Sequence, residues 1–404
     1  MFTDLTLTAI LYDLGRLTGL IAFFGLGILV FAGDTTRFFD RFFGFDRLIP
    51  FLKKLSYGTA VFLLLHPIFF MIAKQKFLAY LIPDFFYLHL ALGIVAFYLF
   101  IIVMIASALY KRISHLAWQY LHVLNYILFF ISLQHAKHWG SSSSYWYISA
   151  SYQAMLFLIV IGLIYRAQHK IRHKTKAYPI KNIINENHDT KTFVFDMGEK
   201  QHFQAGQFCL LRIHDKTRKL HARHPFTMSN APGSTELAFT IKQSGRFTEA
   251  LFQLKKGDKV LIEGPFGIFT KKRCTTKRQV FIAGGVGITP FKSMLEDPST
   301  ENDPRKIFLF YGARSKKNML FEDFFSKKLS KKFHAIYCLS QEKKSDGICE
   351  IGYIDEKILL KYITSFEETC FYICGPEAMK QSVIGILKKH KVPKEHIIVE
   401  HFYW

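Results

Sequence analysis

The sequence predicts a multi-domain membrane protein, in which an α-helical transmembrane bundle precedes a small antiparallel β-barrel and an α/β domain. Three observations lead to this prediction. Long apolar segments fill the chain up to about residue 170, short β-like runs with turn signals follow, and the last part alternates buried strands with a Gly-rich turn and helices. We place the three domains at 1–170, 178–272 and 273–404.

Composition and charge restrict the class of protein. Half of the 404 residues are hydrophobic, 42 are Phe, and the formal net charge is +22. A chain this basic suits either nucleic acid or the anionic face of a membrane. No zinc spacing or RNA-binding signature supports the first alternative, and the apolar segments favour the second. We therefore expect membrane lipid as a partner and no nucleic acid.

Five segments approach the ~20 apolar residues that a membrane-spanning helix needs. We place them at about 7–32, 55–75, 85–109, 119–137 and 145–165. The N-terminus lacks the basic region and the cleavage site of a secretory signal, so the first segment is expected to remain as a helix. Residues 37–47, which mix Arg and Phe, are expected to form an interfacial helix, with a short sixth span as the alternative.

The basic flanks of the spans predict the orientation. Three of them share one side, which the positive-inside rule makes cytoplasmic: 37–54, 111–112 and 166–174. We therefore expect a multi-pass protein of the inner (plasma) membrane with its C-terminal half in the cytoplasm. Three lysines lie on the opposite side, against the rule: Lys74, Lys76 and Lys137. All six Cys lie in the C-terminal half without a C-x-x-C pair, which suits a reducing compartment.

Histidines in the apolar segments are the candidate metal ligands. His66, His89 and His122 lie within predicted spans, and His135 lies near the end of one. Ionisable side chains at membrane depth are costly and usually functional, and imidazole ligates heme iron. The alternative is that each is a buried His bonded to a neighbouring helix. His115 and His138 are expected nearer the two surfaces.

Spacing suggests how the histidines pair. His122 and His135 are 13 residues apart, or about 20 Å along a helix, which suits two hemes stacked across a membrane. Their side chains would point ~140° apart and so meet different neighbours. We expect one heme between His66 and His122 and another between His89 and His135. Pro67 is expected to kink its helix and to shift the depth of His66.

The stretch after Tyr178 carries a flavin motif. Strand-like runs lead to His224-Pro225-Phe226-Thr227, which resembles the flavin motif of the ferredoxin–NADP reductase superfamily in the form seen in ferric reductases and NADPH oxidases. The resemblance implies that Phe226 stacks on the flavin of FAD and that Thr227 hydrogen-bonds near its N5. It places His224 near the FAD phosphates, with Arg223 just before it. A flavin needs these group types: an aromatic face, a donor and positive charge.

Two further turns agree with this resemblance in order and distance. Gly245-Arg246-Phe247-Thr248 precedes a helical run and resembles the family's second phosphate-binding turn, where backbone N–H groups meet an anion. Gly264-Pro265-Phe266-Gly267 resembles the turn that closes the β-barrel. The resemblance implies that Gly245 and Thr248 contact FAD.

The third segment carries a nicotinamide motif. A buried strand leads to a glycine-rich turn and a helix, and the turn resembles the superfamily's GGxGxTP loop for a dinucleotide pyrophosphate through Gly284, Gly285, Gly287, Thr289 and Pro290. A later strand ends in Cys374-Gly375-Pro376, which the resemblance places beside the nicotinamide. Arg314 resembles the adenosine 2′-phosphate contact of NADPH-binding members, with a solvated basic turn and NADH as the alternative. In the family a C-terminal aromatic covers the flavin, here Phe402 or Trp404.

Taken together, the chain resembles prokaryotic NADPH oxidases and ferric reductases. The resemblance implies an oxidoreductase that passes electrons from cytoplasmic NAD(P)H through FAD and one or two b-type hemes to an external acceptor, either dioxygen or a ferric complex. The family carries paired His on two helices, whereas the residue fourteen after His66 is Tyr80. Two alternatives stay open: a heme subunit that feeds a periplasmic reductase, and a heme-free membrane-anchored flavin reductase.

Overall fold

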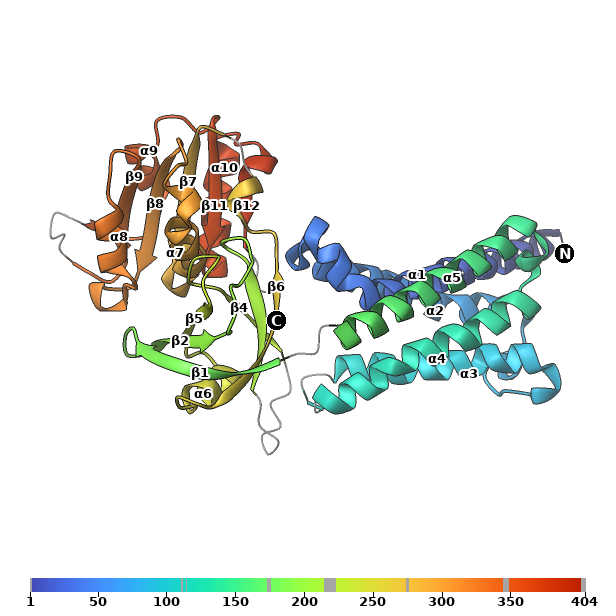
Figure 1. The fold of residues 1–404 in the computed structure, drawn as a ribbon. Coiled ribbons are helices and arrows are strands. Elements are labelled where there is room, and N and C mark those ends of the chain that lie inside the picture. The colour runs from blue at the N-terminus through green and yellow to red at the C-terminus, as the bar shows by residue number, and fades with distance from the viewer. Residues whose placement is uncertain are drawn as a thin grey trace. The chain divides into compact units, whose positions relative to one another are not determined.

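The fold is described from a computed structural model, in two separate units. The structure describes residues 2–109, 112–113, 115–172, 176–213, 223–273, 276–343 and 349–400. Unit 1 comprises residues 1–39 and 47–174, and unit 2 comprises residues 40–46 and 175–404. Figure 1 shows helices in the first and two sheets with helices in the second.

Unit 1 is a bundle of long helices (Figure 1). They are α1 (Phe2–Phe43), α2 (Phe45–Lys74), α3 (Leu88–Ala108), α4 (His115–Trp139) and α5 (Trp146–Arg172). Short 3-10 turns join them: η1 (Leu78–Tyr80), η2 (Phe85–Tyr87) and η3 (Ser141–Ser144). Residues 37–43, expected in a separate interfacial helix, instead continue α1. Gly44 ends that helix with φ +78°, a conformation that glycine adopts without steric cost.

Four of these helices are long and apolar enough to cross a membrane: Leu7–Phe43, Arg47–Lys74, Phe85–Ala108 and Trp146–Ile171. The prediction of spans is thus confirmed for these four by length and composition. Within the described residues, α4 does not reach the same apolarity, although 25 residues would be long enough. The reason is its polar side chains, which include four His, Asn125 and Gln134.

Glycines set how neighbouring helices pack. A Cβ atom on Gly15, Gly19 or Gly25 of α1 would run into Phe70, His66 and Thr59 of α2 respectively. Later residues of α1 thus contact earlier residues of α2, so the two helices run antiparallel. Gly93 of α3 is covered in the same way by His135 of α4. Small residues at these contacts let helix backbones approach closely, as is usual in membrane bundles.

Unit 2 begins with a six-stranded antiparallel sheet in the order β4-β3-β6-β1-β2-β5. Its elements are β1 (Lys176–Asn185), β2 (Thr190–Asp196), β3 (Phe208–Ile213), β4 (His224–Thr227), β5 (Glu236–Lys242), α6 (Arg246–Phe252) and β6 (Lys259–Phe266). A closed barrel would pair the edge strands β4 and β5 along their lengths. The described pairing between these edges is one bridge, from Met228 to Phe239, so the sheet is curled but not closed by a full ladder.

The second sheet is parallel, in the order β10-β9-β8-β7-β11-β12, as the α/β prediction required. Its strands are β7 (Arg278–Gly284), β8 (Lys306–Ala313), β9 (Phe333–Leu339), β10 (Cys349–Ile351), β11 (Thr369–Cys374) and β12 (Ile397–Val399). Two helices cover one face, α7 (Thr289–Glu296) and α8 (Glu322–Lys328). The other face carries α9 (Glu356–Tyr362) and α10 (Glu377–Lys389). The cysteines were expected to suit a reducing compartment, but Cys370 of β11 is disulfide-bonded.

Candidate functional site

His66 of α2 is held in a fixed orientation by α1. Its Nδ1–H donates to the carbonyl oxygen of Gly15, at 2.8 Å. Because a carbonyl can only accept, this bond puts the hydrogen on Nδ1 and leaves Nε2 with a free lone pair. The ring lies against Gly19, one turn further along α1, where a Cβ would come within 2.5 Å of Nδ1. The helix pair thus presents Nε2 of His66 as a ligand atom.

His135 of α4 has the same support from α3. Its Nδ1–H donates to the carbonyl oxygen of His89, also at 2.8 Å, and a Cβ on Gly93 would come within 2.5 Å of that Nδ1. In both helix pairs the carbonyl and the glycine are four residues apart. Metal-bound His usually donates its other ring N–H to such an oxygen, which fixes the tautomer and the ring direction.

The imidazole rings of His66 and His135 lie close together, with their planes 81° apart. The ring centroids of His66 and His135 are 6.2 Å apart. An imidazole–metal bond is roughly 2 Å long, and the ring adds roughly 1 Å, so two rings on opposite sides of one ion have centroids about 6 Å apart. The separation of the two rings therefore fits a heme iron, which His66 and His135 would hold through imidazole nitrogen and which would carry one electron at a time.

The other two candidate ligands lie elsewhere, which changes the expected pairing. His122 stacks on Trp118 of its own helix at 4.7 Å, and its Nδ1 lies 3.4 Å from Asn125. His89 stacks on His138 at 4.6 Å. Hence the structure pairs His66 with His135, whereas we expected His66 with His122 and His89 with His135. Within the described residues no group of three or more His, Cys, Asp or Glu could hold a metal.

The flavin motif forms the edge strand β4. Phe226 is half-buried and stacks on Phe247 of α6, with centroids 6.0 Å apart and planes 20° apart. His224, two residues earlier on the same face, stacks on Phe247 at 4.1 Å. Pro225 faces Leu210 in the strand register, and Thr227 is buried at the end of β4. Stacking on Phe247 holds the rings of His224 and Phe226 nearly parallel to it, and a half-buried aromatic ring such as Phe226 suits contact with one face of an isoalloxazine ring.

The residues expected to contact the FAD phosphates are Arg223, His224, Gly245 and Thr248. Gly245 has φ +105° and open space at its Cβ position. Thr248 holds the turn, since its hydroxyl accepts from the Ser244 amide at 2.7 Å and donates to the Gly245 carbonyl. Arg223 pairs with Glu263 at 3.3 Å. The turn and the guanidinium supply the N–H groups and positive charge that fit the pyrophosphate of FAD.

The two nicotinamide motifs are in direct backbone contact. A Cβ on Gly287 would run into the carbonyl of Cys374, and one on Gly284 would lie 2.7 Å from Pro376. Gly375, with φ +159°, approaches the backbone of Gly284 in return. Thr289 and Pro290 begin α7 beside this contact. Gly285 differs, because it has φ +53° and open space at its Cβ position, which leaves room for a pyrophosphate close to the backbone.

Cys374 lies at the end of β11 with 1% of its surface exposed. Burial, with a smaller contribution from the charge of Glu400, raises the pKa of its thiol far above the ordinary value. The thiol is therefore neutral and unreactive at physiological pH. It can pack against a nicotinamide ring but does not act as a nucleophile. Burial likewise raises the pKa of Cys209, beside the flavin motif, to about 12.

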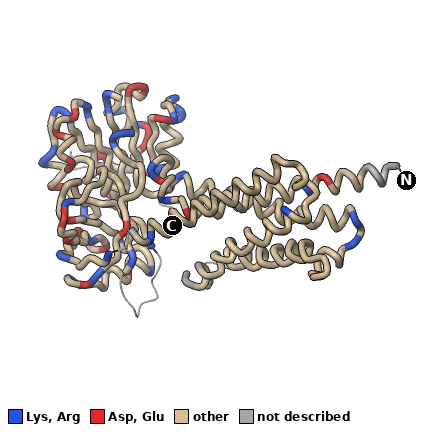
Figure 2. The backbone as a smooth tube through the Cα atoms, turned by 45° about the vertical axis from the view of Figure 1, so that its right-hand side comes forward, with Lys and Arg blue, Asp and Glu red and all other residues tan. Residues whose placement is uncertain are grey.

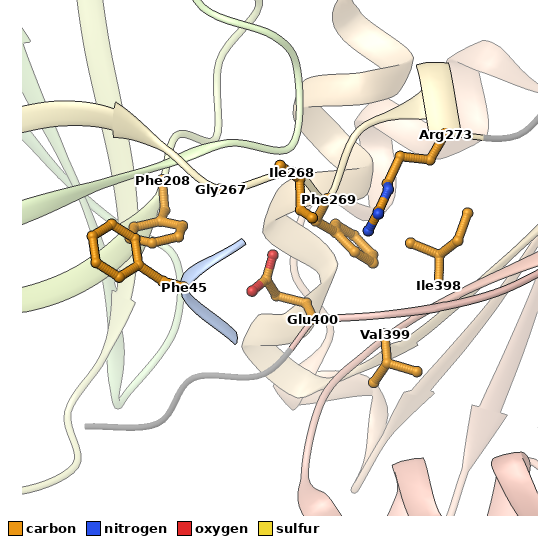
Figure 3. A pocket seen from close by; sticks show the side chains of 9 residues that line it. All are labelled: Phe45, Phe208, Gly267, Ile268, Phe269, Arg273, Ile398, Val399 and Glu400. Atoms are coloured by element: carbon orange, nitrogen blue, oxygen red, sulfur yellow. The ribbon is translucent and has the colours of Figure 1, made fainter. Parts of the chain in front are cut away.

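Glu400 is a residue that the sequence did not single out. It is buried, its amide donates to the carbonyl of Ile373 at 2.9 Å, and its side chain points into a small pocket (Figure 3). The pocket is lined by Phe45, Phe208, Gly267, Ile268, Phe269, Arg273, Ile398 and Val399 together with Glu400. Phe402 and Trp404, the aromatics expected to cover the flavin, lie outside the described residues.

A second missed residue, Asp40, holds the Gly264–Gly267 turn. One carboxylate oxygen accepts from the Gly267 amide at 2.9 Å, and the other accepts from the Phe45 amide at 2.8 Å. Phe45 packs against Phe266, with ring centroids 5.4 Å apart. Neither residue carries a motif, because their roles follow from the tertiary contacts of the short segment 40–46.

Arg314 follows β8 at the carboxyl edge of the parallel sheet, where ligands of open α/β sheets bind. The side chain is exposed, and none of the ion pairs in the described part of the chain involves it. Its backbone is fixed, because the carbonyl accepts from the Gln341 amide at 2.8 Å. Ser315 turns its hydroxyl to Asn318. The guanidinium is thus free to meet a phosphate.

Three protein families match successive parts of the chain. Residues 18–133 match the ferric reductase like transmembrane component, residues 177–270 the oxidoreductase FAD-binding domain, and residues 281–384 the oxidoreductase NAD-binding domain. The chain joins a ferric reductase-like transmembrane domain to FAD-binding and NAD-binding oxidoreductase domains. This confirms the resemblance that the motifs indicated, in the order transmembrane, FAD-binding and NAD-binding domain.

A sequence relative and a solved structure each match a little over half of this chain. The F subunit of the Na⁺-translocating NADH-quinone reductase of Idiomarina loihiensis is 33% identical over 234 residues, which are 53% of this chain and 57% of that protein. The ferric reductase-like chain thus spans little more than half of this relative. The FAD/NAD-binding domain of nitric oxide dioxygenase from Vibrio cholerae aligns with 56% of this chain and 97% of its own, at 22% identity and a TM-score of 0.51.

A flavohemoglobin from Malassezia yamatoensis, solved with bound FAD and heme, aligns with a TM-score of 0.55 at 18% identity. The alignment covers 97% of this chain and 98% of that one. At such identities the two structural matches concern the fold alone.

Proposed function

We propose that the protein is a transmembrane oxidoreductase that moves electrons from cytoplasmic NAD(P)H through FAD and b-type heme to an external acceptor. The observation that carries the proposal is the pair His66 and His135, with ring centroids 6.2 Å apart, in a chain that also has FAD-binding and NAD-binding domains. Each imidazole has its Nδ1–H bonded to a carbonyl, so both Nε2 atoms are available to one iron.

In this proposal the chain's own residues bind and orient the cofactors. Gly284, Gly285 and Gly287 let the backbone approach the dinucleotide, and Cys374 packs its neutral thiol beside the nicotinamide. Phe226 supplies the aromatic surface for the flavin, and Thr227 a hydroxyl. When bound, FAD takes a hydride and releases single electrons, while heme carries one electron at a time. The protein supplies placement, excludes water and sets the potentials.

A single heme is the reading that the geometry favours. The described residues bring two imidazoles to a ligating separation at one place, and His122 has no such partner there. His66 lies eight residues before the end of α2, or about 12 Å along that helix, and His135 lies four residues before the end of α4. The proposed heme therefore belongs to the half of the bundle that we assign to the outer leaflet.

Because heme carries one electron at a time, the proposal includes acceptors that take single electrons. Dioxygen, which would give superoxide, and a ferric complex are both one-electron acceptors. The curated relative is named for reduction of a quinone, and a periplasmic protein is a further alternative. Orientation in the inner membrane, with the oxidoreductase domains in the cytoplasm, rests on the basic flanks of the spans.

Four histidine variants test the heme assignment. We expect His66→Ala and His135→Ala to abolish stoichiometric heme, because each removes one proposed ligand, whereas His89→Ala and His122→Ala should retain it. The measurement is an anaerobic visible spectrum of the detergent-purified protein before and after NADPH, with heme and flavin quantified. Equal heme loss in all four variants would contradict the pairing. Full flavin without heme in the wild-type protein would leave a membrane-anchored flavin reductase.

Arg314→Ala tests the nucleotide preference. We propose that the exposed guanidinium meets a 2′-phosphate, and a charge-assisted contact of this kind is worth about 1.5–3 kcal/mol. We expect the variant to lose roughly 10-fold or more in kcat/KM for NADPH and to keep its kcat/KM for NADH. Lys327→Ala, in α8, is the matched control for loss of a surface charge. An unchanged NADPH/NADH ratio would remove the 2′-phosphate assignment.

A further inference from the structure

One end of the helical bundle carries basic residues that the positive-inside rule disfavours. They are Arg16 in α1, Lys74 at the end of α2, Lys76 just after it and Lys137 near the end of α4. Figure 2 shows that charged residues are sparse along the middle of the bundle. This end is the outer one in the proposed orientation, where the positive-inside rule expects few cations. The presence of four therefore calls for a functional reason. We call this set of four residues the basic end.

The basic end is electrostatically underpaired. Arg16 bonds Asp13 at 3.1 Å and the hydroxyl of Ser142, also at 3.1 Å. For the three lysines the described residues provide no ion pair, and all three are exposed. The other described carboxylate here is Asp84, which caps η2 by accepting from the Phe86 amide. The surplus of positive charge therefore faces solvent.

A continuous chain of contacts runs from this surface to the proposed heme ligand. Lys74 Nζ lies 5.0 Å from the centroid of the Tyr12 ring. Tyr12 packs edge-on to Phe70 at 5.1 Å, and Phe70 packs edge-on to His66 at 5.2 Å. Both Tyr12 and Phe70 are half-buried. Two aromatic rings thus separate an exposed ammonium group from a ligating imidazole.

Two other members of the basic end lie close to the ligands in sequence. Arg16 follows Gly15, whose carbonyl fixes His66. Lys137 lies two residues after His135. Two of the four cations therefore lie within two residues of a group that holds or forms the proposed heme site.

We propose that the basic end binds a small anionic electron acceptor. Electrons would reach this acceptor from the heme site through the contacting rings of Phe70 and Tyr12. The inference rests on the proposed function and narrows its acceptor to an anion, such as a ferric complex with carboxylate ligands. Each NAD(P)H then reduces two acceptors by one electron each and yields NAD(P)⁺ and one proton. His66 and His135 would hold the heme that supplies these electrons, and each acceptor would gain one of them.

The physical reason is electrostatic steering. A cluster of like charge raises the encounter rate of a small counter-ion by about 10- to 1,000-fold at low ionic strength, and the effect falls steeply with salt. A neutral acceptor gains nothing, and a cationic acceptor is repelled. The basic end therefore selects acceptors by charge before any contact is made.

The experiment follows reoxidation of the heme in the full-length protein. NADPH first reduces the heme anaerobically, and the reduced protein is then mixed in a stopped-flow instrument with ferricyanide, ferric–EDTA or the cation hexaammineruthenium(III). We expect Lys74→Glu combined with Lys137→Glu to slow both anions about 10-fold at low salt and to speed the cation. Lys54→Glu, an exposed lysine at the opposite end of α2, should change none of the three rates.

The two stages separate the possible failures. If NADPH does not reduce a heme in the wild-type protein, the proposed function fails before an acceptor is added. If the heme is reduced normally but the charge-reversed protein reacts with all three reagents as the wild type does, the acceptor proposal alone is overturned. Loss of all three rates in equal proportion would overturn it as well, because that result shows a structural defect without charge selection.

Discussion

Gly19→Leu and Gly93→Leu proteins are expected to lose their heme although neither change removes a ligand. A Cβ at either position would lie 2.5 Å from the Nδ1 atom of a proposed ligand, His66 for Gly19 and His135 for Gly93. A leucine there must push the imidazole off its carbonyl partner and away from the iron. Loss of such supporting contacts typically costs 10- to 100-fold in metal affinity. The measurement is the heme-to-protein ratio after purification.

The bundle offers controls that separate heme support from helix packing. A Cβ on Gly25 would run into Thr59, so Gly25→Leu disturbs the same α1–α2 contact without touching a histidine. Gly33 and Gly58 have open space at their Cβ positions, and leucine there should be tolerated. Heme loss in Gly25→Leu equal to that in Gly19→Leu would show that the glycines serve packing alone.

The sequence predicted the FAD-binding and NAD-binding domains but not which histidines lie together in the bundle, and the reason is physical. A flavin or dinucleotide motif is local, because a strand, a turn and a helix start within a few residues place the groups that it needs. The Gly284–Pro290 turn and Cys374 are far apart in sequence, but parallel strands β7 and β11 are neighbours. Strand ends at one edge of a sheet converge, so two local motifs suffice to predict one site.

The pairing of the histidines depends on something that no single helix encodes. Spacing along α4 gave the rise and the angle between His122 and His135, and the angle correctly indicated different neighbours. The ring of His66 is fixed by the register of α1 against α2, and the ring of His135 by the register of α3 against α4. Those registers follow from glycines at 15, 19 and 93, whose role appears only once their contacts are known.

Asp34 is a buried carboxylate in the bundle that the sequence did not single out, because its role also depends on contacts between helices. It accepts hydrogen bonds from Tyr126 of α4 at 2.5 Å and from Arg166 of α5 at 3.0 Å. Arg166 entered the sequence analysis as a cytoplasmic flank, because positive charge near a span is an orientation signal. The structure adds that this arginine also ties α5 to α1, a role that needs a partner 132 residues away.

Gly287→Ala is expected to abolish NAD(P)H oxidation while leaving both cofactors bound. The new Cβ would run into the Cys374 carbonyl and would lie 2.9 Å from the Cα atom of Gly375. Both obstacles are backbone, so relief requires the two nicotinamide loops to separate. A displacement of about 1 Å at reacting groups can cost 100-fold in rate. The measurement is flavin reduction by NADPH under anaerobic conditions.

Gly385→Ala in α10 is the matched control, because its Cβ position is open, and the replacement should even favour the helix slightly. The Gly287→Ala protein should still show its full flavin and heme, and a chemical reductant should still reduce both. That combination would assign the loss to the entry of hydride at the Gly287–Cys374 contact. A wild-type rate in Gly287→Ala would mean that the loops do not need this contact, and the nicotinamide site would have to be placed elsewhere on the sheet edge.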